Sequence, residues 1–226
     1  MKRIKYSEIT PEKIYNNRRS FIKSIGFSAS SIAITSLPFV NNALGKEQDQ
    51  LTSYKDITTY NNYYEFGTSK GDPYKNSQNF KIKPWNISIE GEVEKPIKLS
   101  MEEISNSFTS EERIYRLRCV EGWSMVIPWM GFSLSKLLSK VNPTSKAKFV
   151  AFESVYDPEQ MKGQRYPVLN WPYKEGLRID EAMHPLTTVV TGLYNKELPN
   201  QNGAPLRIFI PWKYGFKSAK AIVKIK

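Results

Sequence analysis

The sequence contains one cysteine, Cys119, and one histidine, His184, among 226 residues. A structural zinc site needs about four Cys or His ligands, an iron–sulfur cluster needs several thiolates, and an attached c-type haem needs a C-x-x-C-H motif. This chain can form none of these, and it cannot form an intramolecular disulfide. The fold must therefore be held by a hydrophobic core, for which 40% hydrophobic residues in a chain of single-domain length suffice.

The formal net charge of +11 is unevenly distributed along the chain. Residues 1–45 contain seven Lys/Arg and two Asp/Glu, which leaves 26 basic and 20 acidic residues, a net charge of +6, in the remainder. The remainder shows no clustered stripe of Lys and Arg. We therefore expect no nucleic-acid partner.

The N-terminus has the pattern of an export signal. Residues 17–23 read Asn-Arg-Arg-Ser-Phe-Ile-Lys, and an apolar stretch of 16 residues diluted by serine follows over 25–40. This stretch is shorter than the roughly 20 residues of a membrane span. The paired Arg18 and Arg19 are typical of the twin-arginine route, which moves folded proteins. We predict a signal peptide over residues 1–45 and one exported, periplasmic domain over 46–226.

Hydrophobic periodicity predicts a mixed domain built on sheets. Alternating apolar residues predict strands over residues 85–89, 113–119, 148–154, 186–193 and 206–210. Ser100 and Glu103 form a capping box that opens a short helix through Ile104, and leucine spacing predicts a helix from near Ser133 to Val141. Residues 46–60 are polar and predict a linker. Because strands outnumber helices, the expected class is α+β, mostly β sheets with short helices.

Cys119 is the residue with the most chemical potential. Two arginines, Arg116 and Arg118, precede it, and a turn containing Gly122 follows it. One interpretation is a buried structural cysteine at a strand end. The other is a thiolate that reacts or binds a metal, since neighbouring positive charge lowers the pKa of a thiol. The residues by themselves leave both interpretations open.

Residues 116–132 resemble the thiolate loop of the bacterial molybdenum-dependent protein-methionine-sulfoxide reductases, catalytic subunit, a family with the sulfite oxidase fold. The resemblance continues in family order through four further blocks, residues 60–67, 180–186, 201–207 and 211–217. It covers nearly all of residues 55–226. It implies a sulfite oxidase-like molybdopterin-binding domain.

The resemblance also assigns site residues. It implies that Cys119 is catalytic and is the only protein ligand of molybdenum in a molybdenum–molybdopterin cofactor (Mo-MPT). The cofactor contacts that it implies are Asn61, Tyr64, Glu65, Ser154, Asn202, Arg207, Ser218, Ala219 and Lys220. An arginine suits a phosphate-bearing cofactor because its planar donors bind oxyanions in pairs. Taken without the resemblance, Asn202 can equally form a turn and Arg207 can lie on a solvated strand face.

Three departures from the family pattern stand out. Ser154 occupies a position where the family more usually has threonine, and residues 218–220 replace a stretch that contains glycine. Family members also usually continue for several tens of residues beyond the equivalent of Lys226, so we expect a C-terminus shorter than the family's.

The implied activity is reduction of protein methionine sulfoxide to methionine by oxygen-atom transfer to molybdenum, in a repair system for oxidised periplasmic proteins. Because the chain can hold neither c-type haem nor an iron–sulfur cluster, electrons must come from a partner. The resemblance implies a membrane haem b subunit that oxidises quinol and forms a heterodimer with this chain. Two alternatives stay open, a sulfite-oxidase-like enzyme acting on another small oxo-substrate and a cofactor-free exported binding module. We expect a structural role for His184, and mainly core positions for Trp123, Trp129, Tyr173 and Trp212.

Overall fold

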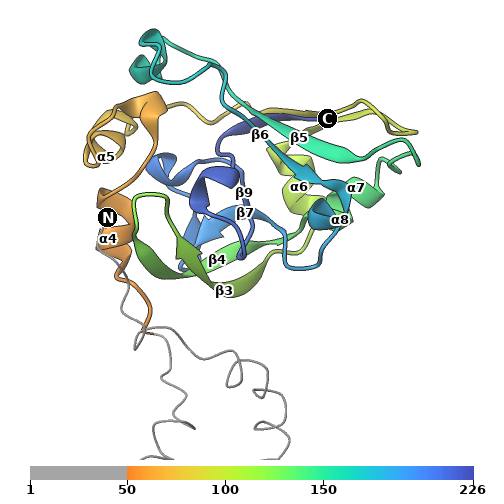
Figure 1. Ribbon diagram of the computed structural model, residues 1–226, viewed down its shortest axis with the longest axis horizontal. Coiled ribbons are helices and arrows are strands. Elements are labelled where there is room, and N and C mark those ends of the chain that lie inside the picture. Colours follow the sequence, from red (N-terminus) through yellow and green to blue (C-terminus); the bar gives the residue numbers. More distant parts are fainter. Residues whose placement is uncertain (1–49) are drawn as a thin grey trace, which may run out of the picture. The chain divides into compact units, whose positions relative to one another are not determined.

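Two five-stranded sheets form the framework of residues 50–226, the part of the chain that this computed structural model describes (Figure 1). The first sheet has the strand order β2–β1–β10–β5–β6. Its strands are β1 (Asn86–Ile89), β2 (Ile97–Ser100), β5 (Phe149–Ser154), β6 (Lys174–Arg178) and β10 (Ile222–Ile225). Strands β1 and β10 are parallel, and the other neighbours are antiparallel. The last strand in sequence therefore lies in the middle of the sheet.

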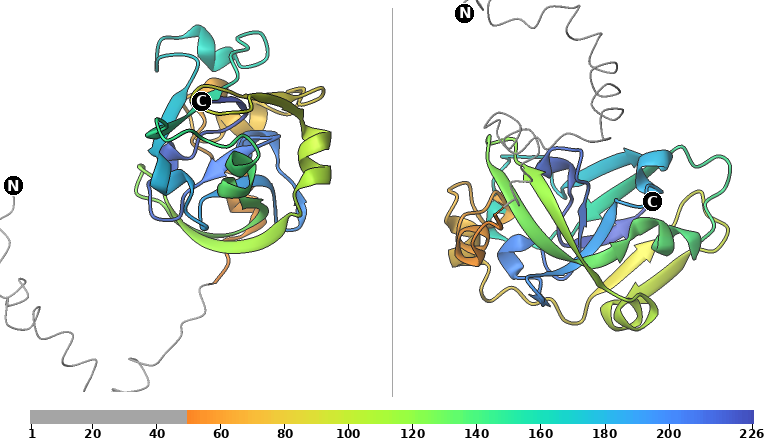
Figure 2. Two further views of the ribbon diagram at one scale, coloured as in Figure 1. Left: turned by 90° about the vertical axis from the view of Figure 1, so that its right-hand side faces the viewer. Right: turned by 90° about the horizontal axis from the view of Figure 1, so that it is seen from below.

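The second sheet has the order β3–β4–β7–β8, with β9 also paired to β7. Its strands are β3 (Glu111–Arg118), β4 (Ser124–Ser133), β7 (Thr188–Leu193), β8 (Lys196–Glu197) and β9 (Arg207–Phe209). Strands β3 and β4 form a long twisted hairpin, seen in green in the right-hand view of Figure 2. This hairpin ends at Cys119, so the second sheet positions the cysteine.

The helices of the described part are short. The α-helices are α4 (Tyr54–Thr59), α5 (Asp72–Asn76), α6 (Met101–Ser107), α7 (Leu134–Ser139) and α8 (Ile179–Ala182). Single 3₁₀ turns are η2 (Tyr64–Phe66), η3 (Lys162–Arg165), η4 (Asn200–Asn202) and η5 (Gly215–Lys217). Three of these turns, η2, η4 and η5, carry or adjoin predicted site residues. In residues 50–226 no helix has the length and apolarity that a bilayer span requires.

Buried side chains form two hydrophobic clusters. The larger one includes Ile87, Ile104, Leu137 and Phe152, and packs α6 and α7 against the strands. The smaller one includes Ile57, Ile127, Trp129 and Phe209, from α4 and the second sheet. Several members of the smaller cluster also line the site described below, so the core and the site share a wall.

The predicted α+β class, mostly sheets with short helices, is confirmed. The capping box of α6 is confirmed, since Ser100 Oγ accepts from the Glu103 amide at 3.1 Å and the Glu103 carboxylate accepts from the Ser100 amide at 2.7 Å. All five predicted strands are present with boundary shifts of a few residues; Cys119 lies just past β3.

Three expectations were wrong or incomplete. Residues 46–60 are not all linker, because Ser53 caps α4 by accepting from the Asp56 amide. The predicted helix from Ser133 to Val141 ends at Ser139. Strands β2, β4, β6, β8 and β10 were not predicted. The predicted signal peptide, residues 1–45, lies outside the described residues.

Candidate active site

Cys119 lies at the start of the turn that joins β3 to β4. Its amide donates to the Trp123 carbonyl at 2.9 Å, and its carbonyl accepts from the Gly122 amide at 3.0 Å. Gly122 has a φ of +84°, a left-handed conformation that favours glycine. A tight turn closed by a left-handed glycine is a common hairpin connection. Cys119 is thereby fixed at the sheet end, 7% exposed and free of any disulfide.

A pocket of about 340 Å³ opens beside this turn. Seven of the predicted site residues line it together, namely Cys119, Asn61, Tyr64, Glu65, Asn202, Arg207 and Lys220. They come from the loop around η2, from the hairpin and from the C-terminal third of the chain. The structure thus brings together residues up to 159 positions apart in sequence (Asn61 to Lys220).

The remaining three predicted residues do not line the pocket. Ser154, Ser218 and Ala219 are buried, with 2%, 1% and 1% of their surfaces exposed. Ser154 lies on β5 opposite Ile222 of β10. Ser218 and Ala219 directly precede Lys220, so they belong to the segment that forms one wall.

Unpaired polar atoms concentrate at this pocket. Among the described residues, seven buried side-chain atoms have no hydrogen-bond partner: Asn61 Oδ1, Tyr63 Oη, Trp129 Nε1, Ser154 Oγ, Asn202 Oδ1, Arg207 Nε and Ser218 Oγ. Five of the seven residues line the pocket. Leaving a buried polar group unpaired costs about 1–3 kcal/mol, and native proteins tolerate few such groups. A polar ligand in the pocket would supply the missing partners.

The two asparagines show how specific this arrangement is. Asn61 and Asn202 both donate their side-chain N–H groups to the carbonyl of Ile57, at 2.8 and 2.9 Å. This orients both amides and leaves both Oδ1 atoms without a donor. The turn expected at Asn202 is present, because Gly203 ends η4 at a φ of +102°. The same residue therefore both shapes the turn and presents an acceptor.

Two cationic side chains, Arg207 and Lys220, also line the pocket in poorly solvated positions. Burial lowers the pKa of Arg207 to about 10. Burial and the neighbouring Arg207 lower the pKa of Lys220 to about 8. Burial raises the pKa of the Glu65 carboxyl, while Lys220 acts in the opposite direction. The alternative that Arg207 lies on a solvated face is wrong, since only 5% of it is exposed. The site favours an anionic ligand.

The chemistry of the pocket fits a molybdopterin cofactor. Such a cofactor brings a phosphate and dithiolene sulfurs, which match the cations and a nearby thiol, and ring N–H groups, which match the asparagine oxygens. Among residues 50–226 no group of three or more His, Cys, Asp or Glu side chains is placed to hold a metal ion. A metal at Cys119 would therefore take most of its ligands from the cofactor.

Several lining residues were not assigned from the sequence. Asn62 Nδ2 lies 4.0 Å from Cys119 Sγ. Tyr63 and Trp129 hold the cations over their rings, with Lys220 Nζ 4.8 Å and Arg207 Cζ 5.1 Å from the ring centres. No periodic signal marks Asn62 or Tyr63, because they lie in an irregular loop.

The aromatic residues expected mainly in the core divide into three groups. Trp129 is buried, and Trp123 and Tyr173 are half-buried in the pocket wall. Trp212 is 43% exposed and packs edge-on against His184, so its core assignment was wrong. His184 accepts from the Leu186 amide at 3.2 Å and does not line the pocket, which agrees with a structural role.

Comparison with known proteins defines the class of protein to which this chain belongs. Residues 74–226 match the family described as the oxidoreductase molybdopterin binding domain. A structural neighbour, the sulfane dehydrogenase SoxCD from Paracoccus pantotrophus, superposes with a TM-score of 0.55 at 13% identity, over 96% of this chain and 59% of that one. This likeness concerns the fold alone. The domain is a molybdopterin-binding oxidoreductase domain of the expected sulfite oxidase-like fold.

Comparison with curated relatives makes the family assignment of this chain more specific. The chain is 52% identical over 233 residues to the protein-methionine-sulfoxide reductase catalytic subunit MsrP of Xanthomonas axonopodis pv. citri (strain 306), covering 97% of this chain and 72% of the relative. It is 48% identical over 252 residues to MsrP of Pseudomonas syringae pv. tomato (strain ATCC BAA-871 / DC3000), covering 98% and 74%. The chain belongs to the family of MsrP catalytic subunits.

Proposed function

We propose that this chain reduces methionine sulfoxide in oxidised periplasmic proteins, with a molybdenum–molybdopterin cofactor held in the pocket beside Cys119. The observation that carries the proposal is the position of the single cysteine at a pocket whose buried polar atoms lack partners. Family membership supports the same reaction, since the relatives are named as methionine-sulfoxide reductases. When bound, the cofactor supplies a two-electron redox centre able to accept an oxygen atom.

The residues of the chain have distinct tasks in this proposal. The Cys119 thiolate serves as the protein ligand of the metal, and the rigid turn after β3 fixes its position. Arg207 and Lys220 bind the negatively charged parts of the cofactor, which compensates two buried cations. Asn61 and Asn202 accept hydrogen bonds through the oxygens that Ile57 leaves free.

The mouth of the pocket admits the substrate side chain. Val120, Leu169 and Phe216 line the pocket and are 58%, 38% and 45% exposed. These apolar side chains suit the methylene groups of a methionine sulfoxide presented by another protein. They also lower the local polarity beside the reacting group, which strengthens its electrostatic interactions with the pocket.

Electrons enter this proposal from a partner, a membrane haem b subunit that oxidises quinol. The relatives are named as catalytic subunits, which supports the existence of a second subunit. In the absence of the partner, purified protein should reduce methionine sulfoxide with reduced viologen but not with NADPH. Direct turnover with NADPH would contradict the requirement for a partner.

The decisive experiment replaces Cys119. Cys119→Ser should abolish sulfoxide reduction, because an alcohol oxygen is a harder and weaker donor than a thiolate. The protein should still fold and retain pterin, since the other pocket residues are unchanged. Molybdenum and pterin content, circular dichroism and viologen-driven turnover are measured together. Near-wild-type turnover would refute the ligand role, whereas absence of molybdenum from folded wild-type protein would favour the cofactor-free binding module.

Export is a separate part of the proposal. The motif over residues 17–23 supports transport of the loaded, folded protein by the twin-arginine route. Replacing both Arg18 and Arg19 with lysine should leave the precursor in the cytoplasm, as fractionation and immunoblotting would detect. Normal periplasmic accumulation of this variant would contradict the twin-arginine assignment.

A further inference from the structure

Residues 210–221 pass from β9 in one sheet to β10 in the other and form one wall of the pocket. This segment carries Ser218, Ala219 and Lys220. Its middle part is weakly anchored by apolar burial, because Trp212, Tyr214 and Phe216 are 43%, 54% and 45% exposed. Polar contacts with other elements, among them the backbone bridge between Tyr214 and Arg118, must therefore contribute to holding the wall in place.

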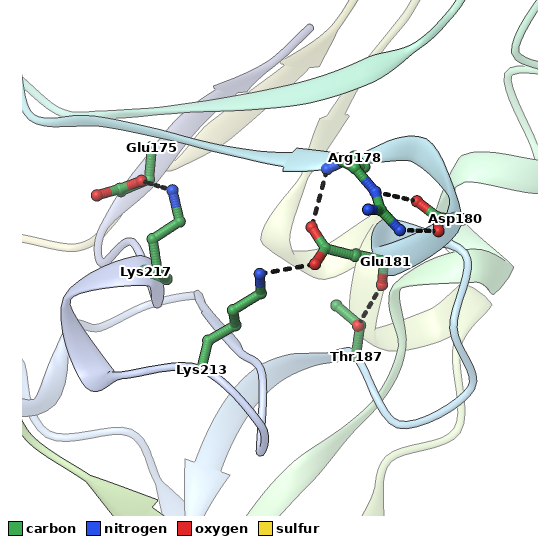
Figure 3. Close-up of polar contacts among 7 residues, drawn as sticks. All are labelled: Glu175, Arg178, Asp180, Glu181, Thr187, Lys213 and Lys217. Carbon is green, nitrogen blue, oxygen red and sulfur yellow. Dashed lines mark hydrogen bonds and ion pairs between the residues drawn. The ribbon is translucent and has the colours of Figure 1, made fainter.

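Two lysines of this segment form ion pairs with two glutamates on other elements (Figure 3). Lys213 Nζ lies 2.7 Å from the carboxylate of Glu181 on α8. Lys217 makes the equivalent ion pair with Glu175 on β6. The lysines are four residues apart and the glutamates six, so the wall segment is attached at two points to a strand–helix unit of the first sheet.

Both carboxylates are themselves held in place. Glu181 accepts from the Arg178 amide at 3.1 Å, and its carbonyl accepts from the Thr187 hydroxyl at 2.6 Å. The Glu175 carboxylate accepts from the Gly176 amide at 3.3 Å. A side chain that is already oriented loses less entropy when it forms an ion pair, so these two pairs are better placed than isolated surface pairs.

Tyr173 links the second pair to the pocket itself. Its hydroxyl donates to the Phe216 carbonyl at 2.8 Å, one residue before Lys217. Tyr173, Phe216 and Lys220 all line the pocket, whereas Lys217 and Glu175 do not. The ion pair thus lies behind the wall and not in the site.

We propose that Lys217 and Lys213 are positioning residues, which by pairing with Glu175 and Glu181 hold the wall segment at the place where Ser218 and Lys220 meet the cofactor. The cofactor part of this inference rests on the proposed function. The mechanical part does not, because the pairs form within the chain itself.

The test measures amide hydrogen exchange over residues 215–221 in cofactor-free protein. Lys217→Met and Glu175→Gln should each speed exchange in this segment about five-fold, which corresponds to about 1 kcal/mol of local opening free energy. The double variant should exchange no faster than either single variant, as expected for residues that act as a pair. Exchanging the charges, with Glu175→Lys and Lys217→Glu together, should restore slower exchange.

The matched control is Lys224→Met, which removes one ammonium from the same C-terminal stretch. Lys224 lies on β10, which the sheet itself holds, and its Nζ is 3.6 Å from Glu90. This variant should leave exchange over residues 215–221 unchanged. Wild-type exchange in Lys217→Met, or equal acceleration in Lys224→Met, would overturn the proposal.

A second readout, pterin content after dialysis, connects the ion pairs to the cofactor. Lys217→Met should lose pterin faster than wild type and Lys224→Met should not. If wild-type protein binds no cofactor, the proposed function fails while the exchange experiment still decides the mechanical role. If wild-type protein is loaded and Lys217→Met retains pterin equally well, the positioning role toward the cofactor is refuted.

Discussion

Arg207→Met should affect the cofactor-free and the loaded protein in opposite directions. Arg207 is almost fully buried, donates to the Asn202 carbonyl at 2.9 Å and has an unpaired Nε. Its guanidinium stacks over the Trp129 ring at 5.1 Å. Methionine keeps much of the side-chain volume and removes the charge, so the substitution isolates the electrostatic contribution.

The magnitude follows from the pKa of Arg207. Burial lowers it to about 10, far below the ordinary value of an arginine, and since each pKa unit equals about 1.36 kcal/mol, the charged form carries a penalty of about 3.4 kcal/mol. Removing the charge also removes two hydrogen bonds, to the Asn202 carbonyl at 2.9 Å and to the Ser218 carbonyl at 3.4 Å, together about 1.5 kcal/mol, and a cation–π contact, about 1 kcal/mol. The net expectation is that cofactor-free Arg207→Met is stabilised by about 1 kcal/mol, or about 3 °C in Tm for a domain of this size.

The loaded protein should respond in the other direction. Losing a buried, paired charge at an anionic ligand costs about 2–5 kcal/mol of binding free energy, which is at least about 30-fold in affinity. Calorimetry of protein produced with and without cofactor synthesis, combined with molybdenum and pterin analysis, measures both effects on the same variant.

Arg113→Met is the matched control for this substitution. Arg113 lies on β3 away from the pocket and donates to the Pro185 carbonyl at 2.8 Å and to Glu111. Its loss should destabilise the protein modestly and leave cofactor content unchanged. The reasoning is refuted if cofactor-free Arg207→Met unfolds at a clearly lower temperature than wild type, because the guanidinium would then stabilise the empty pocket.

Two further predictions concern Gly163, which packs against the backbone of η2, and Lys220, which lines the pocket. Gly163→Ala should destabilise the protein by about 1–3 kcal/mol and reduce pterin content, since a Cβ there would lie 2.0 Å from the Tyr64 carbonyl and 2.7 Å from the Glu65 carbonyl. The control Gly71→Ala should change neither stability nor pterin content, because a Cβ at Gly71 would have no atom within 4 Å. Equal Tm values for the two variants would contradict this packing argument. In cofactor-free protein, Lys220→Met should be more stable than wild type below about pH 8, and the difference in stability should shrink as pH rises toward 10.5. The reason is that burial lowers the folded-state pKa of Lys220 to about 8, so the cost of burying its charge is fully present below that pH. A stability difference that does not vary with pH in denaturant titrations would contradict this prediction.

Local patterns explain which parts of the fold could be predicted. The capping box of α6 is formed by residues three apart, and the alternation along β3 puts Tyr115 and Leu117 on the more buried face. Strand β4 was missed because Pro128 and Gly131 disfavour a strand. The structure explains Gly131, since a Cβ there would lie 2.0 Å from the Val189 carbonyl of β7. That close approach depends on tertiary packing and leaves no periodic signal.

The site was predictable from motifs but not from periodicity. Alternation along β9 puts the Arg207 side chain on one face of the strand and those of Leu206 and Ile208 on the other. In a sheet with one solvent-exposed face, this pattern would make Arg207 a solvent-facing residue. The structure covers that second face with η4 and the segment before β10, so both faces of β9 are buried. Strand β10 itself pairs with β1, more than 130 residues earlier in the chain. Contacts of such separation cannot be read from local sequence.

Most of the unpaired atoms and both buried cations lie in two segments of the chain, and this distribution bears on how cofactor and fold depend on each other. Residues 61–65 and 202–220 contain five of the seven residues with unpaired atoms and include both buried cations, Arg207 and Lys220. These two segments therefore carry most of the penalty for unpaired polar atoms and buried charge, while Trp129 on β4 and Ser154 on β5 carry the rest. Local opening should be easiest in the two segments in cofactor-free protein. A ligand that binds only the closed pocket stabilises the whole domain by mass action. Cofactor loading should therefore slow amide exchange most strongly in these two segments, and it should also raise the Tm of the domain. Exchange protection that increased uniformly over both sheets on loading would argue against this local coupling.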